Sequence, residues 1–297
     1  MYERFYPGMD WTAHAAHWPH AQHSRFVQAG GIRWHVQVMG QGPVLLLLHG
    51  TGSGSFSWRG LMPWLAQHFT VVAPDLPGHA FTSRGPEGAL SLPGMSDSVR
   101  ALMLQLDLTP HAIAGHSAGA AIAAHMALQH ERMKHSLLVG LNPAWLPLPG
   151  VASWLFGPAA KLAAINPLSA WATAKMAARP GAVAQWVART GSTLDAAGLD
   201  LYTRVLSDSG HVHSVLSMMA AWRIKPLAAR LSQLHHPVFM AIGAQDQTVP
   251  PALADEACRL MPQAQKWLQP GLGHLAHEQD PQGTAAQILH WCGAAPV

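Results

Sequence analysis

The 297-residue sequence has few cysteines and little charge, and both shortages exclude classes of protein. Its two cysteines, Cys258 and Cys292, are too few for a disulfide framework and do not form a metal-binding C-x-x-C pair. They fit a reducing compartment, so the sequence predicts a cytoplasmic protein. Charged residues make up only 11% of the chain and apolar residues 49%, a balance that excludes intrinsic disorder.

Long apolar runs and cofactor motifs are also missing. Residues 151–165 come nearest to the length of about 18 apolar residues that a transmembrane helix needs, but Gly157, Pro158 and Lys161 interrupt them. The first residues lack the apolar stretch of a secretory signal. No G-x-G-x-x-G or Walker sequence opens a helix, so we expect no nucleotide cofactor. Lysine and arginine are scattered, at a net charge of +3, which argues against a nucleic-acid partner.

Histidine, in contrast, is abundant, with 20 residues. His14, His17, His20 and His23 recur at every third position, which suggests a metal site. Pro19 interrupts the stretch, however, and a period of three does not keep one helical face. We therefore expect a solvated or loosely docked arm there, and no metal.

The order of apolar runs predicts an α/β protein. Expected strands lie at residues 25–29, 32–39, 43–48, 69–73, 111–114, 136–141, 237–243 and 266–268. Expected helices lie at residues 57–68, 96–106, 120–130, 251–260 and 281–292. This alternation is typical of a mostly parallel central sheet flanked by helices. Residues 143–225 hold several helical stretches without a convincing strand, so we expect a helical cap inserted into a core of residues 1–142 and 226–297.

The most informative motif is the pentapeptide Gly115-His116-Ser117-Ala118-Gly119, a G-x-S-x-G match. A short apolar run precedes it and a stretch rich in Ala, Ile and Met follows it. Strand, sharp turn and helix form the context of a nucleophile elbow, in which a strained turn exposes the serine hydroxyl. The flanking residues thus favour a catalytic Ser117 over a chance match in a loop.

A serine nucleophile needs a base and an acid that orients the base. Asp246 and His274 each follow an expected strand, in the chain order Ser, Asp, His. His274 would take the proton of Ser117, and Asp246 would hold the imidazole in the correct tautomer. Two alternatives remain: Asp246 could merely cap a turn, and His277 is a rival base. We favour His274 because Gly271 and Gly273 frame it in a tight loop.

The oxyanion hole is expected from two backbone N–H groups, those of Ala118 and Thr51. Ala118 follows the serine directly, and Thr51 lies in the glycine-rich loop after the first parallel strand. His49 more plausibly braces this loop than takes part in chemistry. His116, beside the serine, is expected to line the substrate pocket.

The expected cap is rich in tryptophan, with Trp145, Trp154, Trp171, Trp186 and Trp222. These indoles either form the core of the cap itself or line a wide apolar pocket beneath it. On the second interpretation, Trp154 and Trp186 would bind substrate together with His116. Lysines and arginines interleave with the indoles, mostly as solvated surface.

The candidate triad and the His49-Gly50-Thr51-Gly52 loop resemble the α/β-hydrolase superfamily over almost all of the chain from Arg25 onward. Other stretches resemble one subfamily, the magnesium chelatase accessory proteins of bacteriochlorophyll biosynthesis. They are GIRWHVQ at 31–37, SLPGM at 91–95, AINPL at 164–168, GSTLD at 191–195, SGHV at 209–212 and MMAAW at 218–222.

The resemblance implies an accessory role in magnesium insertion into protoporphyrin IX in a photosynthetic bacterium. Two hypotheses remain open. The protein could be a serine hydrolase acting on an ester or related acyl bond, or a tetrapyrrole-binding or chelatase-assisting protein that retains a triad without turnover. The partners implied are a small apolar acyl or tetrapyrrole ligand and magnesium chelatase subunits. Peripheral contact with the photosynthetic membrane is left open.

Overall fold

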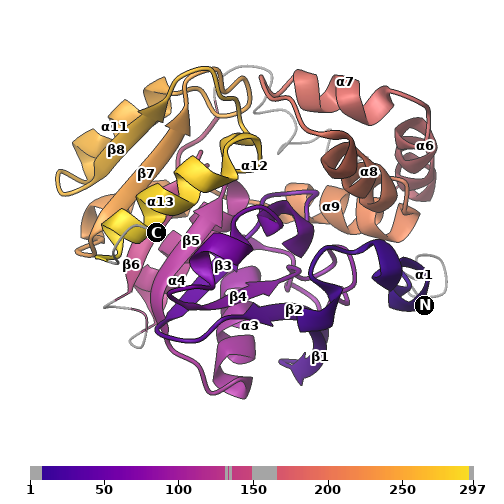
Figure 1. Ribbon diagram of the computed structural model, residues 1–297, viewed down its shortest axis with the longest axis horizontal. Helices are drawn as coiled ribbons and strands as arrows, with labels where there is room; N and C mark the ends of the chain where they lie inside the picture. The colour runs from indigo at the N-terminus through magenta and orange to yellow at the C-terminus, as the bar shows by residue number, and fades with distance from the viewer. Residues whose placement is uncertain (1–8, 131–132, 134–135, 149–165, 294–297) are drawn as a thin grey trace.

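A sheet of eight strands forms the centre of the computed structural model, which describes residues 9–130, 133, 136–148 and 166–293 (Figure 1). The strand order is β1-β2-β4-β3-β5-β6-β7-β8. β2 pairs antiparallel with β1 and β4, and every other neighbouring pair is parallel. The strands are β1 (Ser24–Ala29), β2 (Ile32–Met39), β3 (Val44–Leu48), β4 (Thr70–Pro74), β5 (Pro110–His116), β6 (Leu137–Leu141), β7 (Val238–Gly243) and β8 (Gln265–Gln269). The predicted α/β fold is confirmed.

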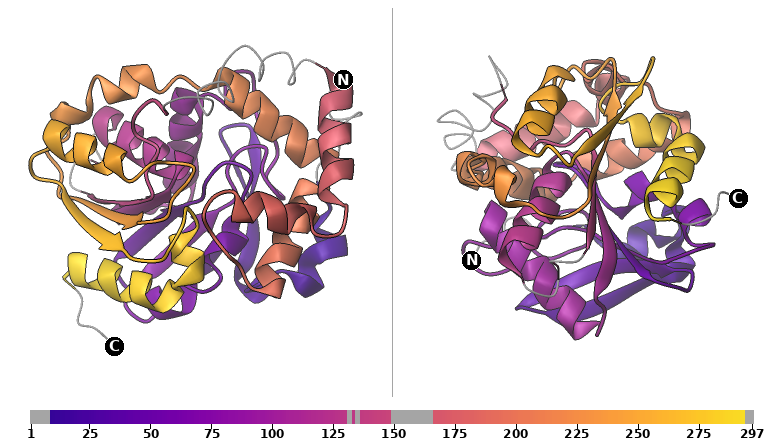
Figure 2. Two further views of the ribbon diagram at one scale, coloured as in Figure 1. Left: turned by 90° about the horizontal axis from the view of Figure 1, so that it is seen from above. Right: turned by 90° about the vertical axis from the view of Figure 1, so that its left-hand side faces the viewer.

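Helices cover both faces of the sheet, as the right-hand view of Figure 2 shows. The α-helices are α1 (Trp11–His14), α2 (Met62–Leu65), α3 (Leu92–Gln105), α4 (Ala118–Gln129), α6 (Pro167–Ala177), α7 (Ala182–Ala188), α8 (Ala196–Leu206), α9 (Ser209–Ala221), α10 (Lys225–Ala228), α11 (Ala252–Leu260), α12 (Ala276–Gln279) and α13 (Pro281–Trp291). Short 3₁₀ helices are η2 (Ala15–His17), η3 (Ala21–His23), η4 (Ser55–Trp58) and η7 (Leu231–Gln233).

The leucines of β3 show how the core is divided between the two faces. Successive side chains of a strand point to opposite sides. Leu46 and Leu48 therefore pack in one apolar cluster with residues of α3, α4 and α11, and Leu45 and Leu47 pack in a second cluster with α2 and α13. All four are fully buried, as expected for a central parallel strand.

Two local expectations are wrong. Residues 57–68 do not form one helix, since η4 ends at Trp58 and the short α2 begins only at Met62. Between them the backbone of Gly60 passes so close to Pro281 that a Cβ on Gly60 would lie 2.7 Å from that side chain. The N-terminal arm is not solvated or loosely docked either. Trp18 is buried, and its indole N–H donates to the hydroxyl of Ser55 at 3.4 Å. Nε2 of His20 donates to the Arg59 carbonyl at 2.8 Å. The expectation considered only the spacing of the histidines, whereas the buried Trp18 is the residue that anchors the arm.

The helices α6, α7, α8 and α9 follow β6 in the chain and precede β7, and we call them the cap helices. In Figure 1 they gather at the upper right, beside the sheet. The described part of residues 143–225 contains no strand, in agreement with the sequence. The exact boundaries of the cap, at 143 and 225, stay a prediction.

Candidate active site

Ser117 stands on a sharp turn between β5 and α4. Its φ of 52° is positive, a conformation that is uncommon without glycine. The glycines on either side allow the turn: a Cβ on Gly119 would lie 2.0 Å from the Leu48 carbonyl oxygen, and one on Gly115 would lie 2.4 Å from the nitrogen of Ala120. The strand–turn–helix geometry that the pentapeptide predicts is therefore present.

Asp246 and His274 are brought together from separate loops. The Nδ1 atom of His274 lies 2.7 Å from Oδ2 of Asp246, and both side chains are nearly or fully buried. The other carboxylate oxygen, Oδ1, accepts from the backbone N–H groups of Thr248 at 2.7 Å and Val249 at 2.8 Å. Because an ionised carboxylate can only accept, Nδ1 of His274 must carry the proton. Its Nε2 is then left with a free lone pair.

Asn142 also donates to Asp246, and the sequence analysis assigned it no role. Its Nδ2 lies 2.7 Å from the same Oδ2 atom that His274 contacts. Asn142 follows β6 directly and has a φ of 45°. The signal available in the sequence was an asparagine directly after the expected strand at residues 136–141, where the carboxyl ends of parallel strands form the site.

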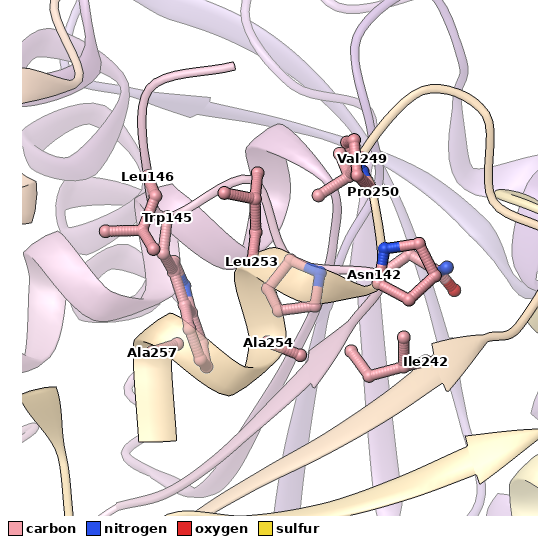
Figure 3. A pocket seen from close by; sticks show the side chains of 11 residues that line it. Asn142, Trp145, Leu146, Ile242, Val249, Pro250, Leu253, Ala254 and Ala257 are labelled. Carbon is pink, nitrogen blue, oxygen red and sulfur yellow. The ribbon is translucent and has the colours of Figure 1, made fainter. Parts of the chain in front are cut away.

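Figure 3 shows the surroundings of Asn142, a small pocket between the end of β6 and α11. Its volume is only about 10 Å³, and its lining includes apolar Trp145, Ile242 and Leu253. A space of this size holds about one water molecule. The pocket therefore supports the Asn142 loop and is not a ligand site.

A loop of the cap holds both the Asp246 loop and the His274 loop. The carbonyl of Thr190 accepts from the backbone N–H groups of His274 and Gln247, each at 3.2 Å. The next residue is Gly191, where a Cβ would lie 1.9 Å from the Gln245 carbonyl oxygen. Only glycine permits this approach. The GSTLD stretch at 191–195 thus begins in contact with the loop of Asp246.

Two buried histidines fix the loop that contains Thr51. Nε2 of His49 accepts from the N–H of Leu76 at 2.9 Å, so its Nδ1 is the atom that donates to the Gly50 carbonyl at 2.8 Å. Burial lowers the pKa of His49, which keeps this neutral form. The expectation that His49 braces the loop fits these contacts.

His211 makes the same kind of contact from cap helix α9. Its Nδ1 accepts from the N–H of Ala80 at 2.9 Å, so Nε2 donates to the Gly52 carbonyl at 3.3 Å. Burial lowers the pKa of His211 to about 4, so the ring is neutral at neutral pH. The carbonyls on both sides of Thr51 are thereby engaged, one from the core and one from the cap.

A cavity of about 460 Å³ lies between the core and the cap helices, a volume in the usual range for small-molecule sites. Ser117 and His274 both line it, and so do Thr51 and Ala118. Neither Thr51 N–H nor Ala118 N–H donates to another group in the part of the chain that the structure describes. The cap contributes mainly apolar side chains, namely Val183, Trp186, Val187, Leu206, Val215, Met219 and Trp222.

The tryptophans of the expected cap have different locations. Trp186 and Trp222 line the cavity. Trp145 is buried in the core, where its indole N–H donates to the Ala120 carbonyl at 2.8 Å, and Trp171 is exposed to solvent. Trp154 lies outside the described residues. Of the two indoles expected to bind substrate, Trp186 therefore lines the cavity, whereas Trp145 and Trp171 lie away from it.

His116 and His277 lie behind His274. His116 reaches the cavity wall, and its Nε2 donates to the His274 carbonyl at 2.9 Å. His277 is buried away from the cavity, and burial lowers its pKa to about 3. It lies in the short helix α12 rather than at the start of the final helix. Of the two rival bases, only His274 lines the cavity that Ser117 also lines.

A buried ion pair within the core is linked to cap helix α8. The guanidinium of Arg59 contacts the carboxylate of Glu278, whose side chain is fully buried, and also Asp195 at 2.8 Å. The hydroxyl of Tyr202 donates to Glu278 at 2.8 Å and lies 3.2 Å from the hydroxyl of Ser53. Tyr202 and Ser53 line the cavity, so this network supports its wall.

Among residues 9–130, 133, 136–148 and 166–293, no three His, Cys, Asp or Glu side chains are grouped so that they could hold a metal ion. Within the same ranges, no helix has the length and apolar character needed to cross a bilayer.

Comparison with known proteins gives a consistent result. A family model described as alpha/beta hydrolase fold matches residues 43–281. The chain is 36% identical to the Magnesium-chelatase 30 kDa subunit of Rhodobacter capsulatus, over 95% of this chain and 99% of that protein. Solved structures are similar in fold. An alpha/beta hydrolase fold protein from Burkholderia ambifaria has a TM-score of 0.73 at 23% identity, covering 90% of this chain and 97% of that one. A hydrolase from Pseudomonas aeruginosa PA01 has a TM-score of 0.72 at 20% identity, covering 91% and 98%.

Proposed function

Because the chain belongs to the alpha/beta hydrolase family, we propose that it is a serine hydrolase that cleaves an ester or related acyl bond and thereby assists magnesium insertion into protoporphyrin IX. The observation that carries this proposal is the hydrogen bond from Nδ1 of His274 to Asp246, which leaves Nε2 free to act as a base in the same cavity as Ser117. The buried pair of His35 and Asp75 has the same 2.7 Å distance but does not line the cavity, so what favours His274 as a base is the cavity that it shares with Ser117.

In the proposed mechanism, the Ser117 hydroxyl attacks the carbonyl carbon while Nε2 of His274 takes its proton. Asp246 stabilises the imidazolium that forms. The N–H groups of Thr51 and Ala118 donate to the carbonyl oxygen as it gains negative charge. His274 then gives its proton to the departing alcohol, which leaves an ester on Ser117. Water activated by His274 hydrolyses this ester and restores the serine.

The cavity suggests an apolar substrate. Trp186 and Trp222 offer flat faces, and Met219 offers a polarisable one. His116 lines the cavity, and its Nε2 donates to the His274 carbonyl, so we assign it the role of positioning the base. We propose that the acyl part of the substrate lies against Trp186.

A covalent probe tests the proposed nucleophile. A fluorophosphonate should add once to the wild-type protein and not to Ser117→Ala, as measured by intact-mass spectrometry. Ser217→Ala is a matched control, since the Ser217 hydroxyl only donates to the His213 carbonyl within α9 at 2.8 Å. It should label like the wild type. A wild-type protein that binds an apolar dye in the cavity but stays unlabelled would refute the hydrolase proposal.

A second candidate function rests on the similarity to the Magnesium-chelatase 30 kDa subunit. On this alternative, the protein assists magnesium insertion into protoporphyrin IX, by contact with the chelatase or with the tetrapyrrole, without turnover. Among residues 9–130, 133, 136–148 and 166–293, no lysine or arginine lines the cavity to pair with tetrapyrrole carboxylates, which favours the hydrolase.

Pigment synthesis separates the two functions. The test uses a bacteriochlorophyll-producing bacterium that lacks its own 30 kDa subunit. We expect the wild type and Ser217→Ala to restore bacteriochlorophyll, measured by absorbance of extracts, and Ser117→Ala to restore less than a tenth of it. Full restoration by a stably expressed Ser117→Ala protein would establish the accessory role without catalysis.

A further inference from the structure

Cap helix α6 has its small residues inside and its large residues outside. The face that packs against the neighbouring cap helices consists of alanines, namely Ala170, Ala174 and Ala177, each at most 5% exposed. The opposite face carries three large apolar side chains in water, namely Leu168 (68% exposed), Trp171 (56%) and Met176 (47%). At about 100° per residue, these three positions lie within one side of the helix.

This arrangement is concentrated on one element. In the described part of the chain, five large apolar side chains are exposed, and three of them belong to the 11 residues of α6. The other two, Leu104 and Leu268, lie on separate elements, α3 and β8. Because removing such a side chain from water is favourable, an outward cluster of three indicates a contact surface. We call Leu168, Trp171 and Met176 the outer face of α6.

The charge around the outer face has a single sign. Lys175 lies between Trp171 and Met176 on the helix, Arg179 follows its end, and both side chains are exposed. The sequence from residue 132 to residue 194 contains no aspartate or glutamate, so all its ionised side chains are lysine or arginine. A partner for this surface must therefore tolerate apolar contact and carry negative charge.

We propose that the outer face of α6 docks the cap onto an anionic lipid bilayer. Tryptophan is favoured at the membrane interface, leucine and methionine can enter the acyl boundary, and lysine and arginine pair with anionic headgroups. The face is a single convex helix at the edge of the molecule in Figure 1 and in the left-hand view of Figure 2. A stable protein interface would need about 20–30 residues a side, far more than this helix offers.

Docking of α6 would bring the cavity close to the lipid. α6 packs against α7 and α8, and these helices supply Val183, Trp186 and Leu206 to the cavity wall. An apolar ligand held in the bilayer would then have a short path to the site. The proposal itself does not depend on hydrolysis, because it rests only on exposure and charge.

Flotation with lipid vesicles tests the proposal. The full chain should float with vesicles of phosphatidylglycerol and phosphatidylcholine at low salt. It should bind at least tenfold less to pure phosphatidylcholine, and less again to the mixed vesicles at high salt, because screening weakens contact between surface charges. The double variant Leu168→Ser/Trp171→Ser should lose at least tenfold in binding to the mixed vesicles. Leu268→Ser, which removes from β8 a leucine that is 51% exposed, should bind like the wild type.

The variants should keep their fold, since the altered side chains face water, and all should still label with a fluorophosphonate. Loss of labelling would therefore concern the proposed hydrolase and not the membrane contact. Equal flotation of the double variant and the wild type would overturn the proposal. Failure of the wild type to float at low salt would overturn it as well. If in that case the double variant also lost binding to purified magnesium chelatase subunits, the outer face of α6 would be a protein contact.

Discussion

Asp246→Asn should lower the rate at which Ser117 reacts with a fluorophosphonate by about 10⁴-fold, the loss seen when a triad aspartate becomes asparagine in a serine protease. The reason lies in the hydrogen bonds of the carboxylate. Its Oδ1 accepts from the N–H groups of Thr248 and Val249, so the oxygen of an asparagine must take that position. The new NH₂ group then faces Nδ1 of His274. The imidazole can pair with it only if Nδ1 loses its proton and Nε2 gains one. His274 would then present a donor to Ser117 where a base is needed.

The fold of this variant should survive, because Asn142 can adapt. Its Oδ1 atom is buried without a partner in the wild-type structure, and a rotated amide would offer that oxygen to the new NH₂ group. The measurement is the rate of labelling, with the thermal unfolding temperature as the check on folding. A variant that is folded and labels within tenfold of the wild type would show that Asp246 only caps its turn.

His274→Ala should abolish labelling, and His277→Ala is its control. His277 is buried with its ring 4.8 Å from that of Trp58 and 4.5 Å from that of His116, so its loss should lower stability but not remove the base. The folded fraction of His277→Ala should label at the wild-type rate. If His277→Ala abolished labelling and His274→Ala did not, His277 would be the base.

The sequence predicted those parts of the site that depend on local pattern. The apolar run of β3 and the G-x-S-x-G pentapeptide carry their structural signal within a few residues, so the sheet and the elbow at Ser117 could be placed. Chain order then paired Asp246 with His274, since both follow parallel strands that end at the same edge of the sheet.

Contacts between distant segments could not be predicted in this way. Arg59 and Glu278, both in the core, are 219 residues apart, and nothing in their immediate sequences points to a partner. His211 of cap helix α9 fixes the loop of Thr51, and its sequence likewise gives no sign of this contact. Such pairs depend on how distant segments are placed relative to one another. Local periodicity contains no information about that placement.

Arg59→Met should destabilise the protein by about 3–5 kcal/mol at pH 8, because the buried Glu278 carboxyl must then either stay ionised without its cation or take up a proton far above its unfolded pKa. Methionine keeps much of the volume and apolar length of the arginine stem. Tyr202 would remain as a donor to Glu278, but one neutral hydrogen bond does not offset the burial of a charge. Urea unfolding, followed by tryptophan fluorescence, measures the loss. Arg204→Met is the matched control: Arg204 pairs with the largely exposed Asp200 one helical turn away, so its loss should cost at most about 1 kcal/mol.

The penalty of Arg59→Met should shrink as the pH falls. Burial raises the pKa of Glu278 from 4.5 to about 7, against the opposing effects of the Arg59 guanidinium and the Tyr202 hydroxyl, while nearby Asp195 raises it further. A carboxyl whose pKa is higher in the folded state favours folding fully below its unfolded pKa, and this contribution is lost as the pH rises through about 7. Without Arg59 the folded pKa rises again, so at pH 5.5 Glu278 is protonated and carries no uncompensated charge. The difference in unfolding free energy between wild type and Arg59→Met should therefore be smaller at pH 5.5 than at pH 8, while that of Arg204→Met should change little. An equal penalty for Arg59→Met at both pH values would mean that the variant acts through lost packing alone.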